Sequence, residues 1–209
     1  MKIHTLPLGD YQTNTYIVEN EGHCAIVDPG YEPETILAFL KKHALTADAI
    51  LLTHGHFDHV GAVEKIVEET GCKLWMSERD WSQKNSPLTN YFYPIANCDF
   101  AEVQFCEEGE EISAAGLTFK TLETPGHTRG SVCYLCGDAL FSGDTLFAGS
   151  CGRCDLRGGN FAQMMQSLKR LYDLPGNYHV LPGHDTLSTL EKERQGNIYM
   201  MQAVAGDKM

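Results

Sequence analysis

The segment THGHFDHVG, residues 53–61, concentrates four side chains of types that bind metal ions. His54 and His56 stand two residues apart in an extended stretch, so their imidazoles leave the same side of the chain. Asp58 and His59 follow where the chain turns into a helix, so they can face a neighbouring point. Three imidazoles and a carboxylate at a strand end are costly to bury unless something pairs them. The spacing therefore predicts two adjacent metal ions rather than a solvated polar loop or core histidines held by backbone carbonyls.

Three further candidate ligands occur later in the chain, each directly after a predicted strand. They are His127 in ETPGHTRGS, Asp144 in FSGDTLF and His184 in LPGHDT. A glycine precedes each of them, and glycine permits the tight turns that bring ligand side chains together. The predicted metal ligands are therefore His54, His56, Asp58, His59, His127, Asp144 and His184.

The pattern H-x-H-x-D-H, followed by a later His, an Asp and a final His, resembles that of the metallo-β-lactamase superfamily. The resemblance runs from the segments NTYIV and VDPG to His184. It implies an α/β fold, an αββα sandwich of two mixed sheets with helices outside and the site at the sheet edges. It also implies one metal ion on His54, His56 and His127, another on Asp58, His59 and His184, and Asp144 bridging both.

Nitrogen and oxygen ligands in this number suit two divalent metal ions, with zinc as the first expectation and iron or manganese as alternatives. A bridging hydroxide would be the nucleophile, because coordination lowers the pKa of water from about 15.7 to about 7. The metal ions would also stabilise the oxyanion that forms on the attacked carbonyl. We predict Asp58 and Asp144 as catalytic residues, with Asp58 orienting the hydroxide and Asp144 bridging the ions.

Differences between this sequence and other branches of the superfamily restrict the class of substrate that can be expected. Asp144 occupies the place where class B lactamases commonly have a cysteine, and His59 is retained, which argues against antibiotic hydrolysis. His56 in place of a glutamate argues against the flavodiiron branch. The segments FAGSCGRCDL and TLEKERQGN look like the short single-domain members of the glyoxalase II group. A thiolate leaving group, with a pKa near ~8.5, also needs little protonation, and no clear general acid stands beyond the ligands.

We therefore predict a metal-dependent thioester hydrolase of the hydroxyacylglutathione hydrolase type, acting on a small-molecule thioester or ester. Two alternatives stay open at this point. A mononuclear iron persulfide dioxygenase has the same fold and a similar G-R-x-D segment, and a metal-binding module without hydrolytic turnover would use the same ligands.

Length and composition limit the number of domains, the partners and the localisation that can be expected. The 209 residues, 43% of them apolar, predict a single domain over residues 1–209. A net charge of −12 disfavours a phosphate backbone, so no nucleic-acid partner is expected. The N-terminus lacks the pattern of a secretory signal and no window approaches ~18 apolar residues, which predicts a soluble cytoplasmic protein without a membrane partner. The oligomeric state is left open.

The eight cysteines are interpreted as reduced thiols, because disulfide scaffolds belong to short secreted chains. Cys133, Cys136, Cys151 and Cys154 form two C-x-x-C pairs, close to the spacing of a zinc ribbon. However, SVCYLC predicts a strand, in which residues three apart point to opposite faces. We therefore expect the first pair in the core and the second near the pocket, where a redox role stays open.

The elements that must position these residues alternate strands with helices and repeat roughly once. We predict strands at 14–19, 24–30, 49–54, 73–77, 119–126, 131–136 and 139–144, a last strand and loop at 179–185, and helices at 32–43, 60–71, 161–176 and 188–206. Gly71 is a predicted C-cap, and Ser188 with Glu191 predicts a capping box. Residues 83–98 break the pattern with two prolines and three consecutive aromatic residues, which predicts a lid or binding loop.

Several weaker candidates flank the ligands. Arg153 and Asp155 either form a structural pair beneath the site or contact the substrate, and the pair is favoured. Asp28 in VDPG either orients the metal-binding loop or only makes a turn. The remaining histidines fit no ligand pattern and are expected at the surface or in the core: His4, His23, His43 and His179.

Overall fold

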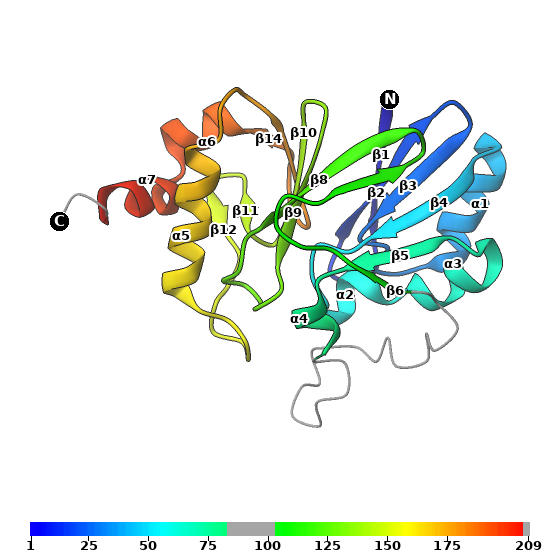
Figure 1. Cartoon of the computed structure of the whole chain (residues 1–209), viewed down its shortest axis with the longest axis horizontal. Coiled ribbons are helices and arrows are strands. Elements are labelled where there is room, and N and C mark those ends of the chain that lie inside the picture. The colour runs from blue at the N-terminus through cyan, green and yellow to red at the C-terminus, as the bar shows by residue number, and fades with distance from the viewer. Residues whose placement is uncertain (83–102, 207–209) are drawn as a thin grey trace.

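Two mixed β-sheets pack against each other between outer helices in the computed structural model, which describes residues 1–82 and 103–206 (Figure 1). The first sheet has the order β1-β2-β3-β4-β5-β6, and the second has the order β14-β13-β10-β9-β8-β7. The first-sheet strands are β1 (Lys2–Leu8), β2 (Thr13–Asn20), β3 (His23–Val27), β4 (Thr46–Leu51), β5 (Lys73–Met76) and β6 (Val103–Phe105). The second-sheet strands are β7 (Glu111–Ala114), β8 (Leu117–Glu123), β9 (Val132–Cys136), β10 (Ala139–Gly143), β13 (His179–Pro182) and β14 (Ser188–Thr189). A separate short pair is formed by β11 (Leu146–Phe147) and β12 (Ser150–Cys151).

Each sheet combines parallel and antiparallel pairs. In the first, β1, β2 and β3 are antiparallel, whereas β3 to β6 run parallel. In the second, the parallel pair β10 and β13 lies among antiparallel neighbours. The helices are α1 (Pro33–His43), α2 (Phe57–Val60), α3 (Val63–Thr70), α4 (Glu78–Trp81), α5 (Phe161–Tyr172), α6 (Leu190–Gly196) and α7 (Ile198–Ala205). The predicted αββα sandwich of two mixed sheets is confirmed.

Side-chain alternation along the strands produces three apolar layers. Ile17 packs toward α1 and α3, whereas its neighbours Tyr16 and Val18 pack between the two sheets. A third cluster fills the space between the second sheet and α5, α6 and α7, with Leu140 and Leu168 among its fully buried members. Because successive residues of a strand point to opposite faces, each sheet can be covered on both sides. The strand ends at which the site lies are therefore part of sheets packed on both faces.

The alternation also decides the role of the first cysteine pair. Cys133 lies in the layer beneath α5, whereas Cys136 lies between the sheets, and both are buried. Their thiols therefore leave opposite faces of β9, as predicted, and cannot converge on one metal ion. The first pair belongs to the packed core.

The end of the chain departs from the predicted single helix over 188–206. Residues 188 and 189 pair as β14, and α6 and α7 are separate helices that meet at Asn197, whose ψ of 113° is extended. The Asn197 side chain accepts from the backbone N–H groups of Tyr199 and Met200 and so starts α7. The predicted capping box is wrong, because Thr189 is the N-cap of α6 and the Ser188 hydroxyl bonds to Glu193 instead.

The predicted strand and helix around the first motif also shift. β4 ends at Leu51, and the helix expected over 60–71 is α3, which begins at Val63 and is preceded by the separate short helix α2. Gly71 is confirmed as the C-cap of α3, with a φ of 66° and its N–H bonded to the Val67 carbonyl. Within the described part of the chain, no helix is long and apolar enough to cross a membrane. The predicted loop over 83–98 lies outside the described residues.

Candidate metal centre

The seven predicted ligands gather at one edge of the sandwich, where strands of both sheets end. The 53–59 segment follows β4, Asp144 follows β10 and His184 follows β13. His127 lies in the loop between β8 and β9. Six of the seven fall into two groups whose ligand atoms lie within 4.8 Å of one another: His54, His56 and His127 in one, and Asp58, His59 and His184 in the other. These two groups have the same members as the two ligand sets that the resemblance implied, and a third group of the same kind combines Asp28 with His54 and His59.

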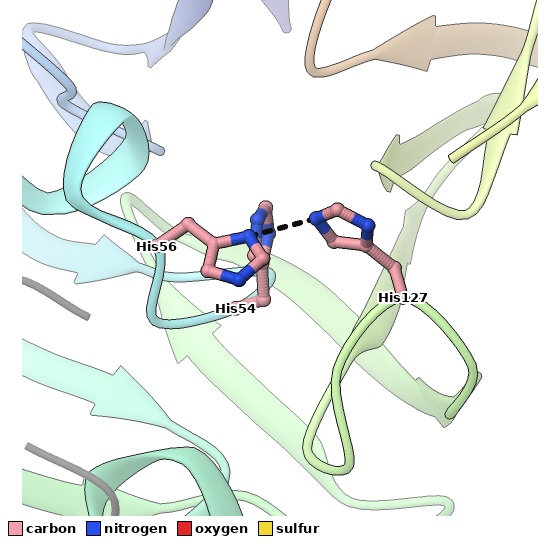
Figure 2. Close-up of side chains that lie close together, drawn as sticks. All are labelled: His54, His56 and His127. Carbon is pink, nitrogen blue, oxygen red and sulfur yellow. Dashed lines mark hydrogen bonds between the residues drawn. The ribbon is translucent and has the colours of Figure 1, made fainter. Parts of the chain in front are cut away.

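In the first group, three imidazoles surround a common point (Figure 2). His127 Nε2 lies 2.8 Å from His56 Nδ1, and the ring centroids of these two residues are 4.5 Å apart. The His54 ring lies 4.8 Å from each of the other two rings and nearly perpendicular to them. We refer to His54, His56 and His127 as the three-histidine cluster.

The second group combines two imidazoles with a carboxylate. His184 Nε2 lies 3.2 Å from Asp58 Oδ2 and 3.4 Å from His59 Nε2. His59 Nε2 in turn lies 3.8 Å from Asp58 Oδ2. We refer to Asp58, His59 and His184 as the aspartate cluster.

Asp144 stands between the two clusters. Its Oδ1 lies 3.4 Å from His59 Nε2, and its Oδ2 lies 3.4 Å from His127 Nε2 and 3.7 Å from His184 Nε2. One carboxylate therefore faces members of both clusters with separate oxygens. This is the placement that a bridging ligand requires.

The donor atoms of His54, His56 and Asp144 are in the protonation state that metal ions bind. His54 Nε2 and Asp144 Oδ1 are buried and have no hydrogen-bond partner among the described residues, although buried polar atoms are almost always satisfied. Burial and the neighbouring His127 lower the pKa of His56 to about 3, and burial and His59 lower the pKa of His54 well below its ordinary value. Burial alone would raise the pKa of Asp144, but His59 and His127 hold it well below the ordinary value. Neutral His54 and His56 beside an ionised Asp144 suit a bound cation. In the aspartate cluster, burial alone would lower the pKa of His59, but the carboxylates of Asp144 and Asp28 raise it, so a metal ion bound there would displace a proton.

Asp28 supports this centre from beneath. Its Oδ1 accepts the Thr53 backbone N–H at 2.8 Å, and its Oδ2 accepts the Thr53 hydroxyl at 2.6 Å and lies 2.9 Å from His59 Nδ1. The carboxylate thus holds the start of the 53–59 segment and turns His59 Nε2 toward the aspartate cluster. Of the two roles left open from the sequence, the orienting one is correct.

Replacing Asp28 by asparagine should weaken the metal ion of the aspartate cluster. Asparagine replaces one carboxylate oxygen with an NH₂ group, which donates a hydrogen bond and does not accept one. Either His59 Nδ1–H or Thr53 then lacks its acceptor, so the orientation of the His59 ring is no longer fixed. Loss of such a partner typically reduces metal affinity about 10–100-fold. Titration of the demetallated protein against a competing chelator measures the change, with exposed Asp173→Asn as the charge-matched control. Equal affinities for the two variants would contradict the role of Asp28.

Backbone carbonyls orient two further ligands. His127 Nδ1 lies 2.7 Å from the Arg153 carbonyl oxygen, and His184 Nδ1 lies 3.1 Å from the Tyr11 carbonyl oxygen. These contacts favour Nδ1–H in both rings, so that Nε2 faces the clusters. Asn14 holds the chain on either side of His184, because its amide donates to the Pro182 and Asp185 carbonyls at 3.0 Å each.

Asp80, on the short helix α4, joins two ligand-bearing loops and was not predicted from the sequence. Its Oδ2 accepts the Gly55 N–H at 3.0 Å and the Thr128 hydroxyl at 2.7 Å, and its Oδ1 accepts the Gly130 N–H at 2.8 Å. Gly55 lies between His54 and His56, and Thr128 follows His127. Burial raises the pKa of Asp80, and the hydrogen bonds from Thr128, Gly55 and Gly130 oppose that rise. One buried carboxylate thus ties together both loops that carry the three-histidine cluster.

A cavity of about 520 Å³ opens over the two clusters. Ligands from both clusters and Asp144 line it, together with apolar side chains and one arginine. Its full lining is Tyr11, His56, Phe57, Asp58, His127, Asp144, Phe147, Arg153, Leu156 and His184. A volume of this size suits a small organic molecule rather than a polymer.

The weaker candidates take other places. Arg153 and Asp155 form a bidentate pair with both nitrogen–oxygen distances at 2.7 Å, but the pair is exposed rather than beneath the site. Cys151 and Cys154 are half-buried, and burial raises the pKa of both thiols, so neither is an activated thiolate. The other four histidines lie outside both clusters and contact carboxylates or aromatic rings: His4, His23, His43 and His179.

Comparisons with known proteins agree with this geometry. The sequence model of the metallo-beta-lactamase superfamily matches residues 8–184. The chain is 34% identical over 206 residues to the probable metallo-hydrolase YqgX of Bacillus subtilis, covering 96% of this chain and 98% of that one. It is 30% identical over 208 residues to the hydroxyacylglutathione hydrolase GloC of Haemophilus influenzae, with the same two coverages.

Several solved structures also resemble this chain over most of its length. TTHA1623, solved in a di-iron-bound form, has a TM-score of 0.81 and 36% identity, covering 94% of this chain and 99% of that one. The B3 metallo-beta-lactamase BLEG-1 has a TM-score of 0.82 and 33% identity, with coverages of 95% and 99%. ETHE1 from Myxococcus xanthus has a TM-score of 0.80 and 31% identity, with coverages of 95% and 84%.

Proposed function

This chain belongs to the metallo-β-lactamase superfamily, and from that membership and its two ligand clusters we propose that it is a two-metal thioester hydrolase of the hydroxyacylglutathione hydrolase type. The observation that carries the proposal is Asp144, which faces both clusters at the base of the cavity. The full-length relative named hydroxyacylglutathione hydrolase supports the substrate class.

The residues around the cavity divide the work of hydrolysis. When bound, the metal ions supply an acidified water as nucleophile and positive charge for the developing oxyanion. The three-histidine cluster would hold one ion, the aspartate cluster the other, and Asp144 both. Asp58 would in addition orient the attacking water. Tyr11, Phe57 and Phe147 give the cavity aromatic lining against which an acyl group could pack.

The cavity favours a leaving group that departs without a proton. All carboxylates and imidazoles among its described lining residues belong to the proposed ligands. Tyr11 and Arg153 remain, and neither is a carboxyl or imidazole group, the side chains that most often serve as general acids. A thiol leaves as thiolate because its pKa is about 8.5. An amine leaving group would need a general acid, so a thioester fits this site better than an amide.

Zinc, iron and manganese all accept this set of nitrogen and oxygen ligands. We propose two divalent ions per chain, with zinc as the first expectation, and the di-iron-bound relative keeps iron as the alternative. Elemental analysis of the purified protein decides between them. One iron per chain, together with oxygen uptake on a glutathione persulfide, would replace our proposal by a persulfide dioxygenase.

Thioester turnover and its dependence on metal form the central experiment. We expect the protein to release thiol from S-lactoylglutathione or a simple acyl thioester, as followed by a thiol-reactive dye. Chelation should abolish the activity and added metal should restore it, because the residues that remain supply no other nucleophile activation. Hydrolysis of a β-lactam in place of every thioester would overturn the proposed substrate class. Metal binding without turnover of any ester, thioester or β-lactam would indicate a binding module.

A further inference from the structure

A second cavity, of about 460 Å³, lies beside the metal centre. We call it the arginine groove and define it by its lining residues: Arg79, Arg129, Gly158, Gly159, Asn160 and Gln163. Two of these six residues are cationic and none is acidic, although the whole chain carries a net charge of −12. The groove is therefore a local exception to the charge of the protein. Three of the six arginines in the sequence line one of the two cavities: Arg79 and Arg129 line the groove and Arg153 lines the metal cavity.

The fold brings the two lining arginines together through Asp80. Asp80 and Gly130 are buried and bonded to each other, and Arg79 and Arg129 are their exposed chain neighbours. The buried carboxylate thus fixes the backbone on both sides of the groove while the two guanidinium groups face outward. A third wall is fixed by the Asn160 backbone N–H, which donates to the Gly126 carbonyl at 2.8 Å.

The arginine groove and the metal cavity are lined by neighbouring stretches of the chain. Arg129 is two residues from His127, and Gly158 is two residues from Leu156, and His127 and Leu156 line the metal cavity. Two residues span at most about 7 Å of backbone. The two linings therefore approach each other within about 7 Å at two points, a separation that one elongated molecule can span.

Both guanidinium groups are available to a ligand. Arg129 forms no ion pair or side-chain hydrogen bond with another described residue. Arg79 donates to Glu123 at 3.1 Å, but the pair is exposed, with 57% and 28% of the two side chains accessible. Exposed pairs contribute little, so Arg79 can exchange Glu123 for a ligand at small cost.

We propose that the arginine groove binds an anionic group, a carboxylate or a phosphate, on the thiol half of the thioester while the acyl group lies over the metal centre. This inference rests on the proposed function and adds its substrate class. Planar guanidinium groups suit both anions, because their N–H donors match paired oxygens. Two such groups beside a cavity of this size select a thiol carrier with charges remote from the sulfur.

Binding of S-methylated thiols to the metal-loaded protein tests the proposal directly. The methyl group prevents the sulfur from ligating metal, and S-methylglutathione, S-methyl-coenzyme A and S-methylpantetheine provide carboxylates, phosphates and no anion respectively. By calorimetry, one of the two anionic probes should bind at least about tenfold more tightly than the neutral one. The preferred probe identifies which anion the groove takes.

Variants separate the groove from general charge effects. Arg129→Ala and the Arg79→Ala/Arg129→Ala pair should lose about tenfold or more of the affinity for the anionic probe and none for S-methylpantetheine. Glu123→Gln should strengthen binding of the anionic probe, because it removes the competitor for Arg79. Lys65→Ala, which removes one positive charge on α3, is the matched control and should change nothing.

The outcomes for the groove and for the hydrolase are distinguishable. If wild-type protein hydrolyses thioesters but the arginine variants retain full affinity and an unchanged KM for anionic substrates, the groove proposal is overturned and the hydrolase stands. If no thioester is hydrolysed but the arginine variants lose the anionic probe, the groove stands and the thioesterase fails. Equal binding of all three probes to the wild type would also overturn the groove.

Discussion

Replacing Asp144 by asparagine is expected to lower kcat/KM about 10³-fold and to leave fewer than two metal ions per chain. The Asp144 carboxylate lies 3.4 Å from His59 Nε2 with one oxygen and 3.4 Å from His127 Nε2 with the other, so it is the one described residue that faces both clusters through separate oxygens. Asparagine preserves the size of the side chain but removes its charge. A metal ion contributes several kcal/mol of transition-state stabilisation, and every ~1.4 kcal/mol is tenfold in rate.

The measurement pairs elemental analysis with steady-state kinetics on the same preparation. Asp138→Asn is the control, because that aspartate is exposed in the turn between β9 and β10, away from the site. We expect it to keep both metal ions and full activity. If Asp144→Asn kept two ions and more than about a tenth of the activity, Asp144 would not be a bridging ligand and the division into two linked clusters would be wrong.

The ligands could be predicted from the sequence because each marks the end of a strand. His54, Asp144 and His184 follow short apolar runs, and a glycine precedes the last two. The parallel neighbours β10 and β13 end at the same edge of the second sheet, which places Asp144 beside His184. His54 follows β4 of the first sheet, and the packing of the two sheets brings it to the same place. Gly183 illustrates why the glycine is needed, because a side chain there would collide with Asp144 Oδ1 and come within 2.6 Å of His59 Cε1.

The supports of the ligands were harder to predict. Asp28 stood in a segment whose residues equally suit a turn, and only its contacts with Thr53 and His59 decide between the roles. Asp80 lies 25 residues from Gly55 and 48 from Thr128, in a helix of four residues without a periodic pattern. Its contacts depend on the packing of β5 and its following helix beside the loop after β8. No local sequence signal encodes that packing.

The end of the chain shows a second reason why the structure could not be fully predicted from the sequence. Apolar residues from 188 to 206 fit one helical pattern, yet Asn197 divides it. The Asn197 side chain is fully buried and donates to the Ser150 carbonyl at 2.9 Å, so a tertiary contact outweighs the continuous helix. An asparagine side chain can form hydrogen bonds with nearby backbone groups in place of the helical backbone bonds. Whether the helix continues or ends there depends on where the side chain is buried. The predicted helix was right in type and wrong in continuity.

Burial of the Asp80 carboxylate costs free energy, and its hydrogen bonds explain why that cost is tolerated. Its carboxylate is 2% exposed and accepts from two backbone N–H groups and one hydroxyl. A buried carboxylate is tolerated when its oxygens are all engaged, because each donor offsets part of the lost hydration. The three donors come from two loops, so removal of Asp80 leaves unpaired groups in both and frees the loops from each other.

Replacing Asp80 by alanine is therefore expected to lower the free energy of unfolding by about 3–5 kcal/mol, because buried donors left unpaired cost about 1–3 kcal/mol each. In the same variant, the metal affinity of the three-histidine cluster should fall about 10–100-fold, whereas the aspartate cluster keeps its ligands and Asp28. Denaturant unfolding measures the first quantity, and stepwise titration against a chelator measures the second. Asp80→Asn keeps one side-chain oxygen as an acceptor and should give an intermediate loss of stability and of metal affinity.

If Asp80→Ala unfolded more easily but bound both metal ions as wild type does, Asp80 would be a structural residue only. Equal weakening of both metal ions would instead show that the two clusters move as one unit.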